Sequence, residues 1–389
     1  MRIGVSAPIE INTLKSHLDN LSEFDLSLGL GGTAVNLIIV GLLRQGHSVV
    51  VFTLDPKIKK KLILKGPHLK IIIGHFRTNS KLKWIDFCHH EYKQIQKFIL
   101  EEKSNLDIVN AHWSYEFAIG TILAKVPHLI TFRDHAPTIL KLSHHHPYRF
   151  FRLLMDYWVR KNGENFSFNS IYLKDKVGLN GDVIPNPVKD ENITTARKHP
   201  QSKKNIDLCF IANGWGHLKN PENAIKGFLQ AKDEVEYIRL NLIGSGYEFT
   251  AEYLQEYLND KHGKSIICWG KLSHHELINK LSNFDILIHT SREESFGNNI
   301  IEAMAAGMPV IAGKNSGAVP WVCENGKSGI LVDVENPIDI ANAIKHLVLD
   351  SEKYENLSKK GIENVKSRFT IEIVAQKYID IYKKIINGT

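Results

Sequence analysis

The 389-residue chain has very little cysteine. Its four cysteines, Cys88, Cys209, Cys268 and Cys323, form no Cys-x-x-Cys pair, so the spacing favours free thiols in a reducing compartment over disulfides or a zinc site. Taken alone, the sequence also has no apolar run near the roughly 18 residues of a membrane-spanning helix. Its start, MRIGVSAPIE, predicts a first strand rather than a signal peptide. These absences favour a globular, cytoplasmic protein.

Two signatures of common enzyme classes are missing as well. The sequence has neither the Gly-x-Ser-x-Gly turn of serine hydrolases nor a Walker phosphate loop. The run His144–His146 has no Cys or carboxylate cluster beside it, and adjacent histidines cannot easily share one tetrahedral ion. We therefore expect no metal site and no cofactor.

Positive charge is concentrated in the first half of the chain. The formal net charge is +7 at pH 7. Residues 1–190 hold 25 basic and 17 acidic side chains, a balance of +8, whereas residues 191–389 balance at −1. Such a split is typical of attraction to nucleic acid, an anionic membrane or a phosphorylated lipid, and it is equally typical of plain solubility.

Short apolar strands alternate with helical patterns in the first half. Apolar residues at helical spacing predict a helix over 33–45, and Ser48–Thr53 follows it as a buried strand. Further strands are predicted at Arg2–Ala7, Leu69–Ile73, Asp107–Ala111 and His128–Phe132. This alternation predicts right-handed βαβ units and a parallel sheet.

The segment Ile184–Val188 marks a boundary, because its two prolines cannot continue a helix or a central strand. A second series of strands is predicted at Asp207–Ala212, Tyr237–Ile243, Ser265–Trp269, Phe284–His289, Pro309–Ala312 and Gly329–Val332. We therefore predict two α/β domains, residues 1–187 completed by a C-terminal helix in 371–389, and residues 188–370. Ligands bind at the carboxyl ends of strands in such sheets, which places the expected site in a cleft between the domains.

The most informative segment runs from Ser291 to Ile311 and reads SREESFGNNIIEAMAAGMPVI. A helix beginning near Gly297 would direct free N–H groups and its positive dipole end at a diphosphate. Glu302 in the second turn would accept bonds from a ribose diol, and Glu294 would lie closer to the sugar. Two carboxylates alone would equally suit a helix cap and a surface glutamate, so the prediction depends on the whole string.

That string resembles the E-x7-E signature of glycosyltransferase family 4. Other segments resemble the family in the same order: Pro185–Val188, Gly244–Gly246, Trp269–Leu272, Ser316–Pro320 and Gly329–Asp333. The likeness covers nearly the whole chain and is strongest over residues 207–335. It implies the GT-B architecture of two facing Rossmann-like parallel-sheet domains, retention of anomeric configuration, and chemistry without a metal.

The resemblance implies a donor site in the second domain. Lys219 matches a lysine that neutralises the leaving diphosphate, and a solvent-facing lysine is the alternative. The arginine that usually precedes it is replaced by Asn213-Gly214-Trp215. Either Lys219 and the helix suffice, or Arg292 or Lys271 substitutes. The expected donor-binding residues are Gly31, Gly32, Gly214, Lys219, Gly270, Lys271, Arg292, Ser295, Phe296, Gly297, Asn298 and Glu302.

The resemblance also assigns residues of the first domain. Gly31 and Gly32 open a helix, where the backbone can approach phosphate oxygens closely. His112, at the carboxyl end of a strand, matches a histidine that contacts the donor sugar, although a chain with 19 histidines also offers it as a structural residue. Arg133 and Asp134 resemble a His-x-x-Asp-type segment on the acceptor or sugar side.

Glu294, His112 and Lys219 are thus the expected catalytic residues of a retaining glycosyltransferase of hexosyl type. It would move a sugar from a UDP- or GDP-linked donor to a glycan or lipid-linked acceptor in cell-surface polysaccharide synthesis. A sugar epimerase of the same architecture and a non-catalytic nucleotide-sugar binder are the alternatives. Nucleic acid is not an expected partner of such an enzyme.

An anionic membrane surface is a further expected partner of the first domain. Basic side chains follow the strand ending at Thr53, namely Lys57, Lys59, Lys60, Lys61 and Lys65. Tyr148–Arg152 combines basic and aromatic residues, although Phe150 and Phe151 equally suit a core. Each lysine near such a surface contributes about 1 kcal/mol, so we expect a peripheral position on the inner face of the membrane. Solubility and an acidic polysaccharide acceptor are the alternatives.

Overall fold

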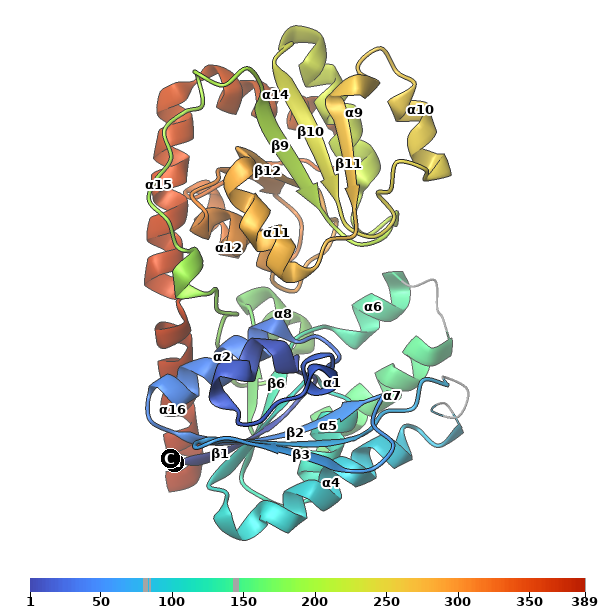
Figure 1. Ribbon diagram of the computed structural model, residues 1–389, viewed down its shortest axis with the longest axis vertical. Helices are drawn as coiled ribbons and strands as arrows, with labels where there is room; N and C mark the ends of the chain where they lie inside the picture. The colour runs from blue at the N-terminus through green and yellow to red at the C-terminus, as the bar shows by residue number, and fades with distance from the viewer. Residues whose placement is uncertain (80–82, 84, 143–146, 389) are drawn as a thin grey trace. The chain divides into compact units, whose positions relative to one another are not determined.

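The computed structural model describes residues 1–79, 83, 85–142 and 147–388 (Figure 1). The chain divides into two compact units, Met1–Pro187 with Ile371–Thr389, and Val188–Thr370. We call them unit 1 and unit 2 and describe each by itself. The run His144–His146, for which no metal role is expected, lies outside the described residues.

Unit 1 contains an eight-stranded sheet in the order β3-β4-β2-β1-β5-β6-β7-β8. Its strands are β1 (Arg2–Ser6), β2 (Ser48–Asp55), β3 (Leu62–Lys65), β4 (Leu69–His75), β5 (Ile108–His112), β6 (His128–Phe132), β7 (Phe166–Phe168) and β8 (Asp182–Val183). Neighbouring strands are parallel, except that β3 runs antiparallel to β4. The sequence does not predict β3, because lysines at 61 and 65 obscure its short apolar run.

Helices on both faces bury the strands of unit 1. They are α1 (Glu23–Leu26), α2 (Thr33–Arg44), α4 (His89–Glu102), α5 (Glu116–Leu123), α6 (Ala136–Leu142), α7 (Pro147–Asn162), α8 (Ile171–Val177) and α16 (Ile371–Asn387), with 3-10 turns at Ile11–His17 and Lys103–Asn105. Alternate residues of β2 face opposite ways. Val49 and Val51 join the core with α2, whereas Val50 and Phe52 join the core with α4. Helices α2 and α4 lie on opposite sides of the sheet (Figure 1). Burial on both faces explains the continuous apolar run of this strand.

The C-terminal helix α16 packs within unit 1, against α2. A Cβ atom on Gly41 of α2 would lie 2.6 Å from that of Ala375, so the absence of a side chain at Gly41 lets the two helices approach. Tyr382 of α16 is fully buried, and its hydroxyl accepts a hydrogen bond of 2.8 Å from Asn110 in β5. The last helix of the chain is therefore joined to the centre of the unit 1 sheet.

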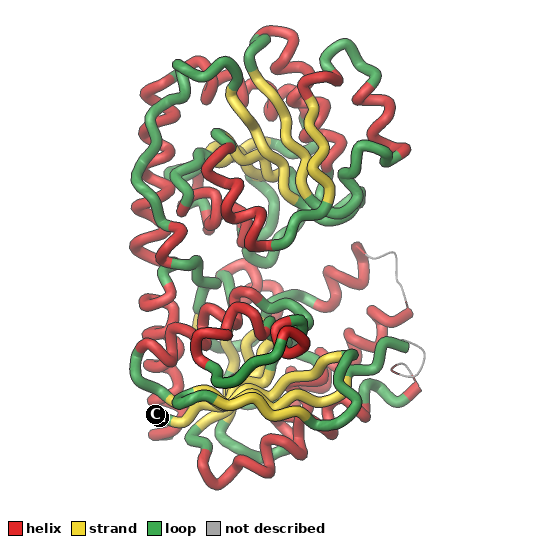
Figure 2. Tube along the Cα trace, viewed as in Figure 1, coloured by secondary structure: helices red, strands yellow, loops and turns green. Residues whose placement is uncertain are grey.

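Unit 2 contains a six-stranded parallel sheet in the order β11-β10-β9-β12-β13-β14. The strands are β9 (Ile206–Ile211), β10 (Ile238–Ile243), β11 (Ile266–Gly270), β12 (Ile286–His289), β13 (Val310–Gly313) and β14 (Ile330–Val332). The helices are α9 (Pro221–Glu234), α10 (Gln255–Leu258), α11 (His274–Lys280), α12 (Asn298–Ala305), α13 (Val319–Val322), α14 (Pro337–Leu349) and α15 (Ser351–Arg368). Short 3-10 turns occupy Asp190–Asn192, Glu252–Leu254, Gly263–Ser265, Leu281–Asn283 and Glu324–Gly326. Helices and strands alternate along this unit (Figure 2).

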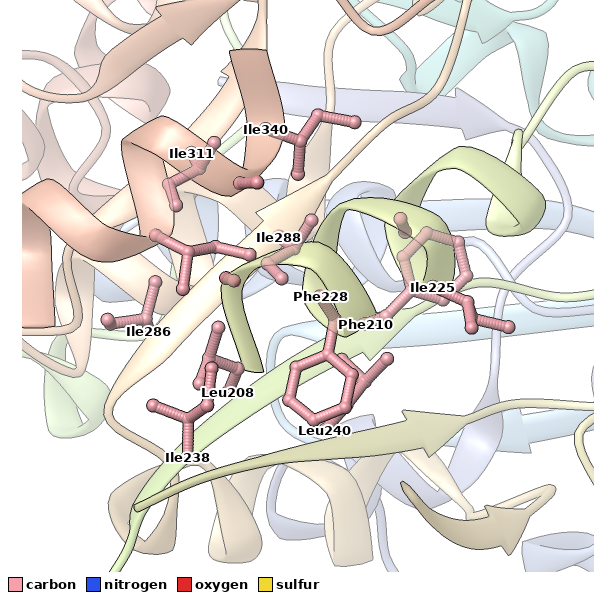
Figure 3. Packing of buried hydrophobic residues seen from close by; sticks show 14 of the residues in the cluster. Leu208, Phe210, Ile225, Phe228, Ile238, Leu240, Ile286, Ile288, Ile311 and Ile340 are labelled. Carbon is pink, nitrogen blue, oxygen red and sulfur yellow. The ribbon is translucent and has the colours of Figure 1, made fainter. Parts of the chain in front are cut away.

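The larger core of unit 2 lies between the sheet and helices α9 and α14. Leu208 and Phe210 of β9 pack there with Ile225 and Phe228 of α9 and Ile340 of α14 (Figure 3). The intervening residues Cys209 and Ile211 belong to a second core that includes α12. The expectation of two parallel-sheet α/β domains is therefore confirmed, with β3 as its antiparallel exception.

Both sheets have a point at which the chain changes direction. From β1 the chain proceeds to β2 on one side, and it later returns to β5 on the other side. In unit 2 it proceeds from β9 to β10 and later returns to β12 on the opposite side of β9. Loops that leave the carboxyl ends of such neighbouring strands diverge and leave room for a ligand, so these two points are the places to look for a site.

Candidate functional site

The loops after β9 and β10 of unit 2 are tied together through backbone groups. Gly214 donates its N–H to the carbonyl of Ser245 at 2.8 Å, and Asn213 Oδ1 accepts from the N–H of Ser245 at 3.1 Å. Gly214 has φ of +81°, and Gly244 has φ of +130°. A Cβ atom at Gly244 would lie only 1.6 Å from the carbonyl oxygen of Ala212. Only glycine fits at Gly244, which explains the Gly-Ser-Gly turn that the sequence shows.

Trp215 belongs to the segment Asn213–Trp215, where the resembled family usually has an arginine. Its ring lies 4.5 Å from that of Tyr253, at an interplanar angle of 31°. The hydroxyl of Tyr253 donates to the carbonyl of Gly246. Trp215 and Tyr253 therefore form an aromatic pair beside the loops after β9 and β10, and the loop after β9 carries its lysine farther along, at Lys219.

A second set of bonds joins the loop after β12 to the loop that carries Lys219. Thr290 donates its hydroxyl to the carbonyl of Asn220 at 2.7 Å, and the Arg292 N–H donates to the carbonyl of Leu218 at 2.8 Å. These two loops leave neighbouring strands at the switch point of the sheet. They bring together Lys219 and Glu294, which are 75 positions apart in the sequence.

Lys219 and Glu294 form an ion pair, with Nζ 2.5 Å from Oε1. His289, the last residue of β12, places its Nε2 3.5 Å from the same oxygen. Burial alone would raise the pKa of this carboxyl. The hydrogen bond with His289 and the positive charge of Lys219 outweigh that effect and hold the pKa of Glu294 below its ordinary value. Glu294 is therefore a fixed negative charge with a cation against it.

Helix α12 begins directly beyond this pair. Its N-cap, Gly297, has φ of +95°, a conformation that favours glycine. Asn299, in the first turn, donates to the carbonyl of Ile211 at 2.9 Å and so fixes the helix start at the end of β9. The N-terminal end of α12 and the ammonium of Lys219 thus lie around the same strand ends. Ser295 lies between Glu294 and the N-cap of the helix, and Asn298 is the first residue of α12.

Glu302 lies in the second turn of α12 and pairs with a histidine that the sequence analysis does not single out. His274 Nε2 lies 3.0 Å from Glu302 Oε1, and both side chains are partly exposed. His274 is the first residue of α11, which begins at a capping box formed by Ser273 and Glu276. That capping box is a recognisable helix start after the strand ending in Trp269-Gly270, and it would have placed His274 near the strand ends.

The surroundings of three expected donor-site residues bear on whether each can bind the donor. Phe296 is 2% exposed and packs against Trp321 and Phe369, so its ring belongs to the core of unit 2. Arg292 holds Glu335 through two hydrogen bonds of 2.5 and 2.8 Å and also donates to the carbonyl of His217. Its charge is compensated, and it is a poor substitute for the missing arginine. Lys271 is exposed beside Gly270, which has φ of +64°.

In unit 1, Gly31 and Gly32 precede α2 as expected, but their surroundings differ. Gly32 is the N-cap, and a Cβ there would lie 2.2 Å from the carbonyl oxygen of Pro8. Gly31 has φ of +89° and open space where a side chain would be. Gly32 is therefore required for close packing, whereas the backbone of Gly31 is open to a ligand.

His112 ends β5 and is completely buried. The guanidinium of Arg133, which follows β6, donates to His112 Nδ1 from Nε at 3.2 Å and from Nη2 at 3.0 Å. Arg133 also donates to Asn186 Oδ1. Burial and the positive charge of Arg133 hold the pKa of His112 well below 6.5.

Asp134 does not join Arg133, although the two are adjacent in the sequence. Its carboxyl accepts a hydrogen bond of 2.9 Å from the hydroxyl of Tyr115, near the guanidinium of Arg152. Burial raises the pKa of Asp134 to about 6. Arg152 stacks 3.5 Å over the ring of Tyr115 and pairs with Glu116 at 3.5 Å. The expected surface patch at Tyr148–Arg152 is therefore partly an internal cluster, and Phe150 is its exposed aromatic residue, at 49%.

Within the ranges that the structure describes, no three His, Cys, Asp or Glu side chains gather in a way that could hold a metal ion. Nor does any described helix combine the length and hydropathy that crossing a bilayer requires. The candidate site thus consists of cations, carboxylates and backbone N–H groups at strand ends.

Residues 192–364 match the family described as glycosyl transferases group 1. The fold is the GT-B fold of two parallel-sheet α/β domains. Sucrose-phosphate synthase from Thermosynechococcus elongatus aligns over 100% of both chains with a TM-score of 0.71 and 18% identity. Anabaena HepE, solved in complex with UDP and glucose, aligns over 99% of this chain and 100% of its own, with a TM-score of 0.67 and 16% identity.

Curated relatives agree with this class. N-acetyl-alpha-D-glucosaminyl L-malate synthase of Bacillus anthracis is 28% identical over 204 residues, 51% of this chain and 52% of that protein. An uncharacterized glycosyltransferase of Methanocaldococcus jannaschii is 25% identical over 316 residues, 78% of this chain and 80% of its own. A lipopolysaccharide core biosynthesis glycosyltransferase of Rhizobium meliloti is 28% identical over 199 residues, 50% of this chain and 56% of its own. The matched region therefore spans about half the length of the first and third relatives. The region similar to glycosyl transferases group 1 coincides with most of unit 2.

Proposed function

We propose that this protein is a retaining glycosyltransferase of hexosyl type, which uses a UDP- or GDP-linked sugar as its donor. The observation that carries the proposal is the Lys219–Glu294 ion pair at the switch point of the unit 2 sheet, beside the start of α12. A cation and the positive dipole end of a helix suit a diphosphate, and a carboxylate nearby suits the hydroxyl groups of a sugar.

Lys219 and α12 bind the diphosphate in this proposal. The ammonium of Lys219 has three N–H donors, and the bond to Glu294 uses one of them. The remaining two are available to phosphate oxygens. When the bond between the anomeric carbon and the phosphate oxygen breaks, negative charge grows on that oxygen, and a fixed cation and helix end stabilise it most in the transition state.

Glu302 binds the ribose of the nucleotide. It lies one turn beyond the start of α12, and its carboxylate accepts hydrogen bonds from a diol. His274 contacts Glu302 at 3.0 Å and orients that carboxylate. His274 is therefore an addition to the residues that the sequence analysis assigns to the donor.

The acceptor hydroxyl attacks the anomeric carbon from the side on which the diphosphate departs, so configuration is retained. The carbon–oxygen bond to phosphate breaks as the bond to the acceptor forms, and the acceptor proton passes to the leaving phosphate oxygen. Such a route needs positioning and charge stabilisation rather than a protein base or a metal. In unit 1, the proposal assigns the Gly31 backbone to the diphosphate and His112 to the transferred sugar. It does not keep Arg133 and Asp134 on the acceptor side, because Arg133 is bound to His112 and Asp134 to Tyr115.

The acceptor in this proposal is a glycan or a lipid-linked glycan of cell-surface polysaccharide synthesis. The name of the Rhizobium meliloti relative supports it, since that protein takes part in lipopolysaccharide core biosynthesis. The Bacillus anthracis relative, an N-acetylglucosaminyl malate synthase, points to a small acid acceptor instead. A competition between a lipid-linked glycan and a small hydroxy acid in the transfer assay distinguishes these acceptor classes.

The proposal is tested by turnover of a panel of UDP- and GDP-sugars, followed through release of the nucleoside diphosphate. Wild-type protein should release it slowly without an acceptor and faster with one, and the linkage formed should keep the donor's anomeric configuration. Glu294→Gln should abolish release, and Glu363→Gln, on the exposed face of α15, should not change it. Interconversion of donor sugars without transfer would instead indicate an epimerase, and binding without turnover would indicate a non-catalytic binder.

We further propose a peripheral contact between unit 1 and an anionic membrane. Lys59 and Lys60 are exposed, whereas Lys57 donates to the carbonyl of Ser27 and Lys61 pairs with Glu101. The exposed pair and the excess charge of the first half support the proposal, at about 1 kcal/mol for each lysine near the surface.

Sedimentation with vesicles tests the membrane contact. Wild-type protein should pellet with vesicles of anionic lipid at low salt, remain in solution with neutral vesicles, and be released by high salt. Lys59→Glu with Lys60→Glu should abolish pelleting. The matched control, Lys198→Glu with Lys204→Glu, makes the same charge change at exposed positions of unit 2 and should pellet like the wild type. Failure of the wild type to pellet would remove the membrane contact and leave the transferase proposal intact.

A further inference from the structure

The contact between Arg133 and His112 determines which nitrogen of the histidine carries a proton. Nε and Nη2 of Arg133 lie 3.2 and 3.0 Å from His112 Nδ1. A guanidinium can only donate hydrogen bonds, and it stays protonated in proteins. Nδ1 must therefore accept through its lone pair, which leaves the proton of a neutral imidazole on Nε2.

His112 is neutral in these surroundings. Its side chain is completely buried, and the neighbouring charge is positive. Both effects lower the pKa of His112, burial more strongly than Arg133. The other titratable groups facing it are the phenols of α16: the ring of Tyr378 lies 6.2 Å away, edge to face, and burial raises the pKa values of Tyr378 and Tyr382.

The Nε2 atom is buried and has no hydrogen-bond partner among the residues that the structure describes. A buried N–H group without a partner is costly, and natural structures rarely keep one without a reason. The next residue, Trp113, has φ of +66°, a strained conformation for a side chain of this size. Unsatisfied polarity and backbone strain at one strand end are typical of functional positions.

We infer that Arg133 is a positioning residue, which fixes His112 as the Nε2–H tautomer and makes it an obligate hydrogen-bond donor to substrate. The inference rests on the proposed function in one respect: the acceptor of that bond is a hydroxyl oxygen of the transferred sugar. His112 in this state cannot remove a proton through Nε2, so it orients the sugar and takes no part in proton transfer.

Arg133 is itself held in place for this task. Its Nη1 donates to Asn186 Oδ1, and its guanidinium lies 5.8 Å from the ring centroid of Trp113. Among the described residues Arg133 forms no ion pair with a carboxylate. Its side chain is bonded to His112 and Asn186 instead. Asn186 stands between two prolines, which restrict the backbone at this position.

The tautomer can be measured without any activity. Protein labelled with ¹⁵N in histidine gives separate signals for protonated and unprotonated ring nitrogens, and the signals missing from His112→Gln assign those of His112. Wild-type His112 should show a bare Nδ1 and a protonated Nε2, unchanged between about pH 8 and about pH 6. A protonated Nδ1, or a ring that titrates in this range, would overturn the inference even if the protein transfers sugar.

Turnover of variants at Arg133 tests the role in substrate binding. In Arg133→Met, neutral His112 can adopt either tautomer, so kcat/KM at about pH 8 should fall about 2- to 10-fold, the loss of one hydrogen bond. Burial, the larger cause of the low pKa of His112, remains in this variant, so the same loss is expected at about pH 6. The ratio of kcat/KM between the two pH values should stay near one in the wild type.

Arg133→Lys is the control for a loss that is merely structural. Lysine keeps the buried charge and one donor toward Nδ1, so it should preserve the Nε2–H tautomer and most of the activity. Equal losses in both variants at both pH values, with an unchanged histidine spectrum, would contradict the positioning role. If neither wild type nor variants turn over any donor, the proposed function fails, and the spectrum of the wild type still decides the tautomer.

Discussion

In unit 2, Nζ of Lys219 lies 2.5 Å from Oε1 of Glu294, although 75 positions separate the two residues in the sequence. Lys219 follows β9 and Glu294 follows β12, which are neighbours in the sheet but not consecutive in the chain. The topology therefore creates the charge pair. His289, at the end of β12, adds a third polar group to it at 3.5 Å.

Removing either partner of this pair should lower turnover by different routes. Lys219→Met removes the cation that stabilises the leaving diphosphate and should lower kcat about 100-fold. It should also raise the pKa of Glu294, whose low value depends partly on Lys219, so activity should acquire an acid limb that the wild type lacks. The double variant Lys219→Met with Glu294→Gln should be no worse than the more damaging single variant, since the pair acts as a unit.

The measurement is steady-state release of nucleoside diphosphate between about pH 5 and about pH 8. Lys226→Met is the matched control, because Lys226 is exposed on α9 and pairs with Glu222 at the surface. If kcat falls no further in Lys219→Met than in Lys226→Met, Lys219 has no role in catalysis.

Asp134→Asn should stabilise unit 1 at neutral pH. The pKa of Asp134 is raised to about 6, so the folded protein binds a proton there that the unfolded chain releases near pH 4. Stability from this group is complete below about pH 4 and is lost as the pH rises through 6. Asparagine still accepts from Tyr115 but does not ionise, and it should gain about 1–2 kcal/mol over wild type above pH 6, allowing for solvent screening.

Chemical denaturation at about pH 4.5 and about pH 7.5 measures this difference. The advantage of Asp134→Asn should be small at the lower pH and full at the higher one. If the stability gained by Asp134→Asn over wild type is the same at both pH values, or is larger at the lower one, the carboxyl of Asp134 is ionised throughout this range.

The two glycines before α2 form a matched pair of tests. Gly32→Ala places a Cβ 2.2 Å from the Pro8 carbonyl, so it should destabilise the fold by about 2–4 kcal/mol. Gly31→Ala meets open space and should cost only the left-handed backbone strain, about 1–2 kcal/mol. If the Gly31 backbone binds the diphosphate, Gly31→Ala should nevertheless lose activity while remaining folded, as thermal unfolding and turnover together would reveal. Full activity in Gly31→Ala would remove this segment from the site.

Treatment with a chelator should leave transfer largely intact. In this account Lys219 and the start of α12 neutralise the diphosphate, which is the task that a divalent ion would otherwise perform. Turnover before and after treatment with EDTA is the measurement. A complete loss that magnesium or manganese restores would mean that a metal ion takes part.

How much the sequence could predict depends on the range of the interactions. The parallel strands and α12 follow from local apolar patterns and from Gly297, so they are visible in the sequence. The partners of the charged groups are not. Arg133 turns to His112, whereas the adjacent Asp134 turns to Tyr115. Only the three-dimensional arrangement separates them.

Other residues also differ from the sequence-based expectation because their partners lie far away in the sequence. Arg292 resembles a free cation in the sequence but is held by Glu335, 43 positions away. Phe296 lies within the most informative segment and still serves the core, since one face of the loop after β12 must pack against Phe369. His274 pairs with Glu302 across 28 positions, and only its capping box gives a local signal.

Calorimetric titration of UDP and GDP into the purified protein tests the central claim most directly, because it measures donor recognition without needing the acceptor. Wild-type protein should bind one of the two at a single site. Glu302→Ala should weaken that binding by about 1–3 kcal/mol, the loss of a charged hydrogen-bonding partner, whereas Glu363→Gln should bind like the wild type. Binding of neither nucleotide, or equal affinity in Glu302→Ala and wild type, would contradict the assignment of α12 and Glu302 to the donor nucleotide.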